Sequence, residues 1–250
     1  MIKFNIWGLE FRCSLLAFAA YLLLLALLCS LGLWQLGRGD QKRALLERQQ
    51  AAATAEALDL NQQTEIDKEL LRYRPALLNG HYDGVHQVLI DNQILDGKPG
   101  YLVLTPFLPD SGQPAVLVNR GWVALGTSRE ALPDITINAP IQQVLGRINH
   151  FPEPGIRLKG AEIPGETWPV RVQVVDSKLL AAKLGYTLAD FQIELDPAQA
   201  EGYQRQWKIA VAIPPEKHRA YAVQWFGLAL TLTALFIWNS SRKQHRGKTI

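Results

Sequence analysis

A histidine and several aromatic side chains recur at helical spacing near the end of the chain. Tyr221, Ala222 and Trp225 follow His218 at intervals of three, four and seven residues, so a helix would carry all four on one face. A neutral imidazole is an axial ligand for haem iron, and aromatic rings pack well against a planar, amphipathic cofactor. The pattern therefore makes His218 a candidate haem ligand.

An aromatic residue and an amide, Trp34 and Gln35, lie at the end of the first apolar run of the chain. If two apolar runs cross a membrane in opposite directions, Trp34 and Gln35 lie at the same depth as His218. An imidazole, the amides of Gln35 and Gln224, and several aromatic rings would then share one membrane boundary. The alternative is an interfacial aromatic belt, in which the glutamines join the helices and His218 faces the lipid headgroups. The sequence leaves both interpretations open.

Two uncharged apolar segments must position these residues. Residues 13–36 and 220–238 contain no charged side chain, and as a helix the second segment would rise about 28 Å, close to the thickness of a bilayer's hydrocarbon core. The first run is too long for a cleaved signal peptide, and the bulky Leu28 before Cys29 argues against a lipoprotein signal. We therefore predict transmembrane helices at residues 13–36 and 220–238.

Positive charge is concentrated in the two tails. The chain has a formal net charge of +3. Residues 1–12 contribute +1 and residues 239–250 contribute +4, which leaves −2 for residues 37–219. Short basic tails stay in the cytoplasm, whereas long loops cross the membrane largely regardless of charge. We expect cytoplasmic tails at 1–12 and 239–250 and a periplasmic domain at 37–219. That domain has no basic excess, so we expect the lipid bilayer as a partner and no nucleic acid.

The segment between the apolar runs carries mainly strand signals. Gly39 to Ala57 reads as a helix that continues the first span, and a helix capped by Asp176 or Ser177 should end before Gly185. Short turns between the other stretches favour antiparallel pairing. The predicted fold class is two transmembrane α-helices flanking an extracytoplasmic α+β domain dominated by antiparallel strands, as a sheet or partly closed barrel. Strands are expected at residues 88–95, 101–108, 115–123, 141–148, 170–175, 191–195 and 207–211.

Motifs of common catalytic and metal sites are missing. Cys13 and Cys29 both lie in the first apolar run, which excludes a thiolate metal site or a disulfide in the domain. His81, His86 and His150 have no partner at the spacing of metal ligands. Because nucleotide-binding and hydrolase motifs are also absent, we expect a protein that is not an enzyme and has no catalytic residues. A periplasmic enzyme with scattered catalytic residues is the open alternative.

Several motifs are spread over nearly the whole chain. Residues 32–38 read GLWQLGR, residues 101–107 begin with Tyr and end in TPF, and residues 118–123 read VNRGWV. Residues 218–226 read HRAYAVQWF. In this combination the chain resembles the surfeit locus 1 family of cytochrome c oxidase assembly proteins.

The resemblance implies a non-enzymatic factor in a bacterial inner membrane. Such a factor would bind haem a transiently and assist its insertion into the catalytic subunit of a haem-copper oxidase, with enzymes of haem a synthesis as further partners. The implied haem iron ligand is His218. The candidate supporting residues are Tyr221, Gln224, Trp225, Trp34 and Gln35.

Two questions stay open at this point. Arg120 either has a structural role beside Gly121, which we favour, or contacts a partner or a haem propionate. The alternatives to haem handling are a cofactor-free membrane scaffold that stabilises an oxidase assembly intermediate, and a two-span sensor. The short tail after Trp238 offers no signalling domain, which argues against the sensor.

Overall fold

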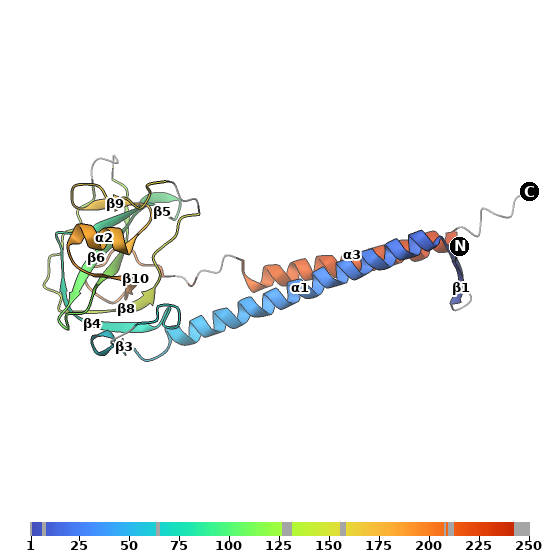
Figure 1. Ribbon diagram of the computed structural model, residues 1–250, viewed down its shortest axis with the longest axis horizontal. Coiled ribbons are helices and arrows are strands. Elements are labelled where there is room, and N and C mark those ends of the chain that lie inside the picture. The colour runs from blue at the N-terminus through green and yellow to red at the C-terminus, as the bar shows by residue number, and fades with distance from the viewer. Residues whose placement is uncertain are drawn as a thin grey trace, which may run out of the picture. The chain divides into compact units, whose positions relative to one another are not determined.

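The computed structural model describes residues 2–6, 9–63, 66–126, 132–155, 159–207, 209 and 213–242. The chain forms two compact units. One consists of Met1–Glu47 together with Ala210–Ile250, and the other of Arg48–Ile209. The first unit is a pair of long helices and the second is a β-barrel domain (Figure 1).

The helical unit is built from α1 (Leu15–Ala53) and α3 (Pro215–Arg242). Both helices are long and apolar enough to cross a membrane. As expected from the sequence, α1 continues beyond its apolar run to Ala53. A hairpin of β1 (Ile2–Ile6) and β2 (Leu9–Cys13), which the sequence reading did not predict, precedes α1.

Small and aromatic side chains join the two helices, which run side by side (Figure 1). Gly32 lies under the ring of Phe226, and a Cβ atom at Gly32 would be 2.6 Å from that ring. Further along the pair, Tyr21 stacks on Phe236 with 4.2 Å between ring centroids, and its hydroxyl lies 3.2 Å from Thr233 Oγ1. Close backbone approach and interhelical hydrogen bonds are the usual sources of helix association in lipid.

Five strands of the second unit close into a barrel in the order β4, β8, β10, β7, β6 and back to β4. All neighbours are antiparallel except β10 and β7. The predicted fold class is therefore confirmed, with the barrel fully closed. The strands are β3 (Leu58–Asp59), β4 (Pro75–Tyr82), β5 (Val88–Leu95), β6 (Lys98–Pro109), β7 (Ala115–Ala124), β8 (Gln143–Asn149), β9 (Val170–Val172) and β10 (Leu188–Leu195), and a 3-10 turn (Leu60–Gln62) follows β3.

Gly80 makes the closure of the barrel possible. Strand β4 pairs with β8 from Pro75 to Asn79 and then with β6 from Gly80 to Tyr82. At this change of partner Gly80 has φ +156°, and a Cβ atom there would be 2.0 Å from the carbonyl oxygen of Leu108. Only glycine fits such a close approach of two backbones.

Alternating side chains divide the apolar residues between two sides of the barrel wall. Val116 and Val118 of β7 belong to a core cluster with members from all five barrel strands, which places that cluster inside the barrel. Leu117, between them, belongs to a second cluster with Val172 of β9 and Leu180 of α2 (Ser177–Leu184). Helix α2 and β9 therefore cover one outer face of the barrel.

Most predicted elements are present with small changes in their bounds. Helix α2 begins after Asp176, which accepts hydrogen bonds from the Lys178 and Leu179 amides, and ends at Leu184, where Gly185 follows with φ +80°. The expected strand at 207–211 is wrong for Trp207 and Ile209, which are in no strand, and the rest of that stretch lies outside the described residues.

Tyr101 carries a buried hydroxyl that costs stability. The side chain is 0% exposed, and its oxygen has no hydrogen-bond partner in the described part of the chain. We expect Tyr101→Phe to raise the free energy of unfolding by roughly 1 kcal/mol, because the change removes an unsatisfied polar group. Thermal unfolding of the full chain in detergent measures this change in the free energy of unfolding. Tyr186→Phe, which loses a 3.0 Å hydrogen bond to Asp83, is the control and should be destabilising; equal losses in both variants would contradict the assignment.

Candidate functional site

His218 and Gln35 form a hydrogen bond between the two long helices. The Nδ1–H of His218 donates to Gln35 Oε1 at 2.8 Å, and only 8% of His218 is exposed. The amide oxygen can only accept, so the contact assigns the imidazole proton to Nδ1. In the neutral ring Nε2 then carries a lone pair.

The second ring nitrogen of His218 has no such partner. Nε2 is enclosed by the protein and makes no hydrogen bond within the described residues. A buried polar atom without a partner is costly, and such atoms in native proteins call for an explanation such as a ligand. Metal-bound histidines commonly donate one ring N–H to an oxygen acceptor while the other nitrogen binds the metal. The arrangement fits an axial ligand whose orientation is fixed by Gln35.

The other predicted residues of this site divide into two groups. Ala222 is 1% exposed and Trp225 is half-buried, so both lie on the side of α3 that carries His218. Tyr221 is 51% exposed, Trp34 is 56% exposed, and Gln224 is exposed as well. The structure therefore brings Gln35 and His218 together, whereas Tyr221, Trp34 and Gln224 lie outside that contact.

Gly39 is also part of this site, although the sequence did not lead us to predict it. A Cβ atom at Gly39 would lie 3.4 Å from His218 Cβ and 3.5 Å from the carbonyl oxygen of Pro215. A side chain there would press on the first turn of α3. A glycine inside a strong helical pattern is the signal that could have indicated this close approach.

Arg120 is enclosed and fully engaged inside the barrel domain. It is 1% exposed, and Nη1 donates to Gln87 Oε1 and to the Ile135 carbonyl, both at 3.0 Å. Nε donates to the Glu201 carbonyl at 2.6 Å, and the Glu201 carboxylate lies 3.5 Å from Nη2. The guanidinium also lies 5.0 Å from the centre of the Tyr203 ring. Of the two explanations for Arg120, this geometry favours the structural one.

The residues after Arg120 bind the segment that contains Glu201, Tyr203 and Gln204 to strand β7. Gly121 has φ +111°, and a Cβ atom there would be 2.8 Å from the Gln204 carbonyl oxygen. The Trp122 amide donates to that oxygen at 2.8 Å, and the Gln204 amide donates back at 3.2 Å. The motif therefore ties the end of the barrel domain to its central strand.

Two histidines of the barrel domain, His86 and His150, lie beside carboxylates. Asp83 accepts hydrogen bonds from His86 Nδ1 at 2.7 Å and from the Tyr186 hydroxyl at 3.0 Å. Burial by itself raises the pKa of Asp83, but these hydrogen bonds outweigh it and hold the pKa below its ordinary value. His150 Nε2 lies 3.2 Å from Glu69 Oε1, but the two atoms do not form a hydrogen bond. Among the residues that the structure describes, no group of three or more histidine, cysteine, aspartate or glutamate side chains is arranged to hold a metal ion.

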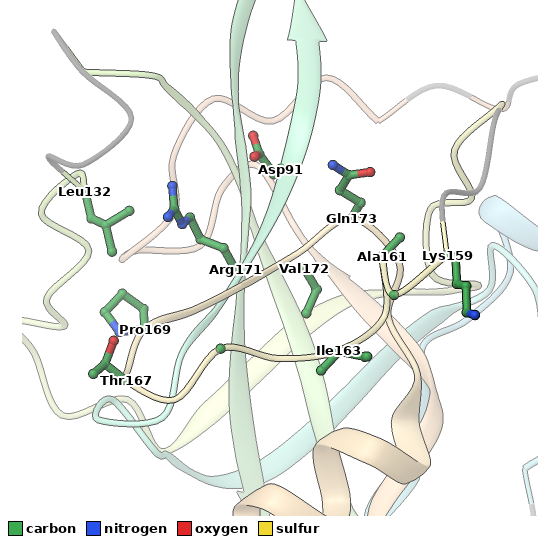
Figure 2. Close-up of a pocket in the computed structure, with 12 residues that line it drawn as sticks. Asp91, Leu132, Lys159, Ala161, Ile163, Thr167, Pro169, Arg171, Val172 and Gln173 are labelled. Atoms are coloured by element: carbon green, nitrogen blue, oxygen red, sulfur yellow. The ribbon is translucent and has the colours of Figure 1, made fainter.

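A cavity of about 810 Å³ lies in the barrel domain beside β9. Figure 2 shows the loop with Ala161, Ile163 and Thr167 curving next to the strand with Arg171 and Val172. Among the described residues that line it, none is a histidine, cysteine, methionine or tyrosine, which are the usual side-chain ligands of haem iron. The cavity also contains none of the residues that the sequence indicated for cofactor binding.

Comparison with known proteins shows similarity along most of the chain. The model of the SURF1 family matches residues 22–230, which include Gln35, Arg120 and His218. A SURF1-like protein of Rickettsia felis is 25% identical over 86% of this chain and 93% of its own length. A SURF1-like protein of Rickettsia conorii is 26% identical over 84% of this chain and 85% of its own length. The cytochrome oxidase assembly protein SHY1 of Saccharomyces cerevisiae is 30% identical over 38% of this chain and 24% of its own length.

Proposed function

Because this chain belongs to the SURF1 family, we propose that it is an assembly factor for a haem-copper terminal oxidase of the cytochrome c type, in a bacterial inner membrane. The similarity to a yeast cytochrome oxidase assembly protein and the two apolar helices support this role. The role requires contact with oxidase subunits. We name the catalytic subunit as the main partner, the bilayer as the setting, and enzymes of haem a synthesis as the source of the cofactor.

The finer proposal is that His218 binds haem a and that the chain assists its insertion into the catalytic subunit. The observation that supports it is the enclosed Nε2 atom, which has no partner and is oriented by the bond from Nδ1 to Gln35. Haem a, when bound, would supply an iron centre, and the His218 imidazole would hold it. Trp225, half-buried on the same side of α3, would pack beside it. Tyr221, Trp34 and Gln224 are exposed and would contact it only from outside the helix pair.

The site suits temporary binding better than permanent storage. It consists of a single histidine between two helices, and Nε2 is reached only when neighbouring side chains give way. An affinity reduced by such an opening step favours release to a partner that binds more tightly. Protein purified from cells that make haem a should therefore carry less than one haem per chain, measured by the pyridine haemochrome method.

A cofactor-free scaffold is the second candidate. The Gln35–His218 hydrogen bond and the stacked Tyr21–Phe236 pair would by themselves join the two helices. Deletion of the chain should reduce oxidase assembly under either proposal. Only haem binding predicts a haem spectrum in the isolated protein, so a colourless protein that still supports oxidase assembly would favour the scaffold.

We also propose that both termini are cytoplasmic and that the barrel domain is periplasmic. Alkaline phosphatase folds actively only outside the cytoplasm, so its fusion after Gly112, in the turn between β6 and β7, should be active. Fusion after Ile250 should be inactive, because basic tails stay inside. Phosphatase activity of whole cells measures both. Activity of the second fusion alone would reverse the orientation.

A further inference from the structure

Another cavity of the barrel domain, of about 540 Å³, lies against the outer face of strands β8 and β10. Val144 and Ile148 of β8 and Ile193 of β10 face the core inside the barrel. Because side chains alternate along a strand, Arg147 and Glu194 face outward, and they are direct cross-strand neighbours. Both residues line the cavity, which therefore carries charged groups on a rigid part of the sheet.

The guanidinium group of Arg147 is held in one orientation. Its Nε donates to Glu194 Oε2, while Glu194 Oε1 accepts a hydrogen bond from Asn149 Nδ2 at 2.8 Å. The guanidinium carbon also lies 5.2 Å from the centre of the Tyr73 ring. The Arg147 side chain is 17% exposed and that of Glu194 is 8% exposed. These contacts determine where the other N–H groups of Arg147 point.

Those other N–H groups have no acceptor. Arg147 Nη2 is enclosed by the protein, and neither Nη1 nor Nη2 makes a hydrogen bond with a described residue. Arg205 lines the same cavity, and its Nε and Nη1 donate to backbone carbonyls, but its Nη2 has no acceptor in the described part of the chain. An enclosed charged donor without an acceptor is costly. The cavity therefore suits a ligand that supplies acceptor atoms.

The charges around the cavity favour an anion as that ligand. The lining contains two positive and two negative side chains, which are Arg147, Arg205, Glu194 and Asp196. Arg72 adds a positive charge beside them, because its guanidinium carbon lies 4.9 Å from the centre of the Tyr73 ring. Three arginines against two carboxylates leave an excess of +1. Both oxygens of Glu194 already accept hydrogen bonds, so this carboxylate does not satisfy the remaining donors.

We propose that this cavity binds a small organic acid with an aromatic or aliphatic body. The end of a guanidinium group presents two parallel N–H groups, which match the two oxygens of a carboxylate. The carboxylate reaches Arg147 at Nη1, which is not enclosed. Tyr73, Trp207 and Leu145 of the lining provide apolar surface for the body of the acid. Inorganic phosphate would match the charge but would leave this apolar surface without a partner.

Equilibrium dialysis of the full chain in nanodiscs tests this site, with empty nanodiscs as the blank. The probes are phenylacetate and naphthalene-2-acetate, which carry a carboxylate on aromatic bodies of two sizes. Phenylacetamide and naphthalene-2-acetamide have the same shapes without the charge, and inorganic phosphate has charge without an apolar body. We expect saturable binding of at least one acid with a dissociation constant of about 1 mM or below. The amides and phosphate should bind at least roughly 10-fold more weakly.

Substitutions locate the bound acid. Arg147→Lys keeps a positive charge beside Glu194 but loses the parallel N–H groups, so binding should weaken roughly 10- to 100-fold. Ala53→Trp, at the last residue of α1, fills the cavity and should abolish binding. The matched controls are Arg74→Lys, at an arginine outside the lining, and Ala51→Trp, at an exposed position of the same helix. Both controls should bind the acid normally.

Thermal unfolding first shows which variants are folded. Failure of both acids to bind the original chain would overturn the proposal, and so would amides or phosphate that bind as tightly as the acids. Unchanged binding in a folded Arg147→Lys or Ala53→Trp variant would also overturn it. If Arg147→Lys does not fold, the comparison of Ala53→Trp with Ala51→Trp decides. Neither Gln35 nor His218 lines the cavity, so a negative result here would leave the haem proposal intact.

Discussion

Replacing His218 with alanine should lower the haem content of the purified chain by on the order of 100-fold or more, because it removes the imidazole nitrogen that we propose as the iron ligand. The barrel domain should remain folded, since its core clusters contain no residue of either long helix. Pyridine haemochrome spectra measure the haem, and the thermal unfolding of the barrel domain measures the fold.

Substitutions of Gln35 distinguish whether His218 binds haem or only joins the two helices. Gln35→Leu removes the acceptor for Nδ1–H, so the ring can rotate or place its proton on Nε2. We expect haem affinity to fall roughly 10- to 100-fold. Gln35→Glu keeps an oxygen acceptor and should recover most of the binding. If the bond served only to join the helices, none of these changes would alter a haem spectrum.

Another histidine provides the matched control. His81→Ala removes an imidazole that is exposed in the barrel domain, and the haem content should not change. An equal loss of haem in both histidine variants would indicate nonspecific binding. Unchanged haem in His218→Ala would exclude His218 as the ligand.

Replacing Arg120 with methionine should cause the largest loss of stability, about 3–5 kcal/mol of unfolding free energy. The change leaves the partly buried Glu201 carboxylate without its cation, removes one of the donors to Gln87 Oε1, and removes the arginine donor of the Ile135 carbonyl. Arg120→Lys should recover only part of the loss, because an ammonium cannot reproduce the fork of the guanidinium. Thermal unfolding of the full chain in detergent is the measurement.

Substitution of Arg74 is the control, because this arginine lies outside the buried network of Arg120. Its Nε donates a single long hydrogen bond, 3.4 Å, to the Glu56 carbonyl at the protein surface. Arg74→Met should change the unfolding free energy by less than about 1 kcal/mol. If Arg120→Met cost no more than this control, the buried network would not support the segment before α3. A normal fold with lost oxidase assembly would instead point to a partner contact at Arg120.

Local signals made some elements predictable to the residue. Strand β5 begins at Val88 and ends at Leu95, where the turn residues Asp96 and Gly97 follow with positive φ. Helix α2 has the predicted cap and stop at Asp176 and Gly185. In these cases a side chain or a backbone angle within a few residues determines the boundary.

The pairing of distant strands was not predictable in the same way. Short turns indicated antiparallel neighbours, yet β10 inserts between β7 and β8 and runs parallel to β7. No local pattern encodes which strand fills that position. The hairpin of β1 and β2 was also missed, because a short run of mixed polar and apolar residues does not distinguish a strand from a tail.

The sequence allowed only part of the candidate site to be predicted. The opposite directions of two apolar helices brought Gln35 and His218 to one depth, and the structure joins them directly. The pattern of three, four and seven residues describes a broad face, however, and it included Tyr221, which is 51% exposed. The line of contact is set by Phe226 over Gly32 and by the bare backbone at Gly39, which only a packed pair of helices reveals.

The position of β10 also governs how the protein can be made. Because β10 separates β7 from β8, the barrel cannot close until the ribosome has translated Leu195, and α3 begins only about 20 residues later. Any product truncated before β10 would expose the edges of β7 and β8 at once, which invites aggregation and proteolysis. Barrel closure and membrane entry of the second helix are therefore nearly simultaneous, late events in biosynthesis.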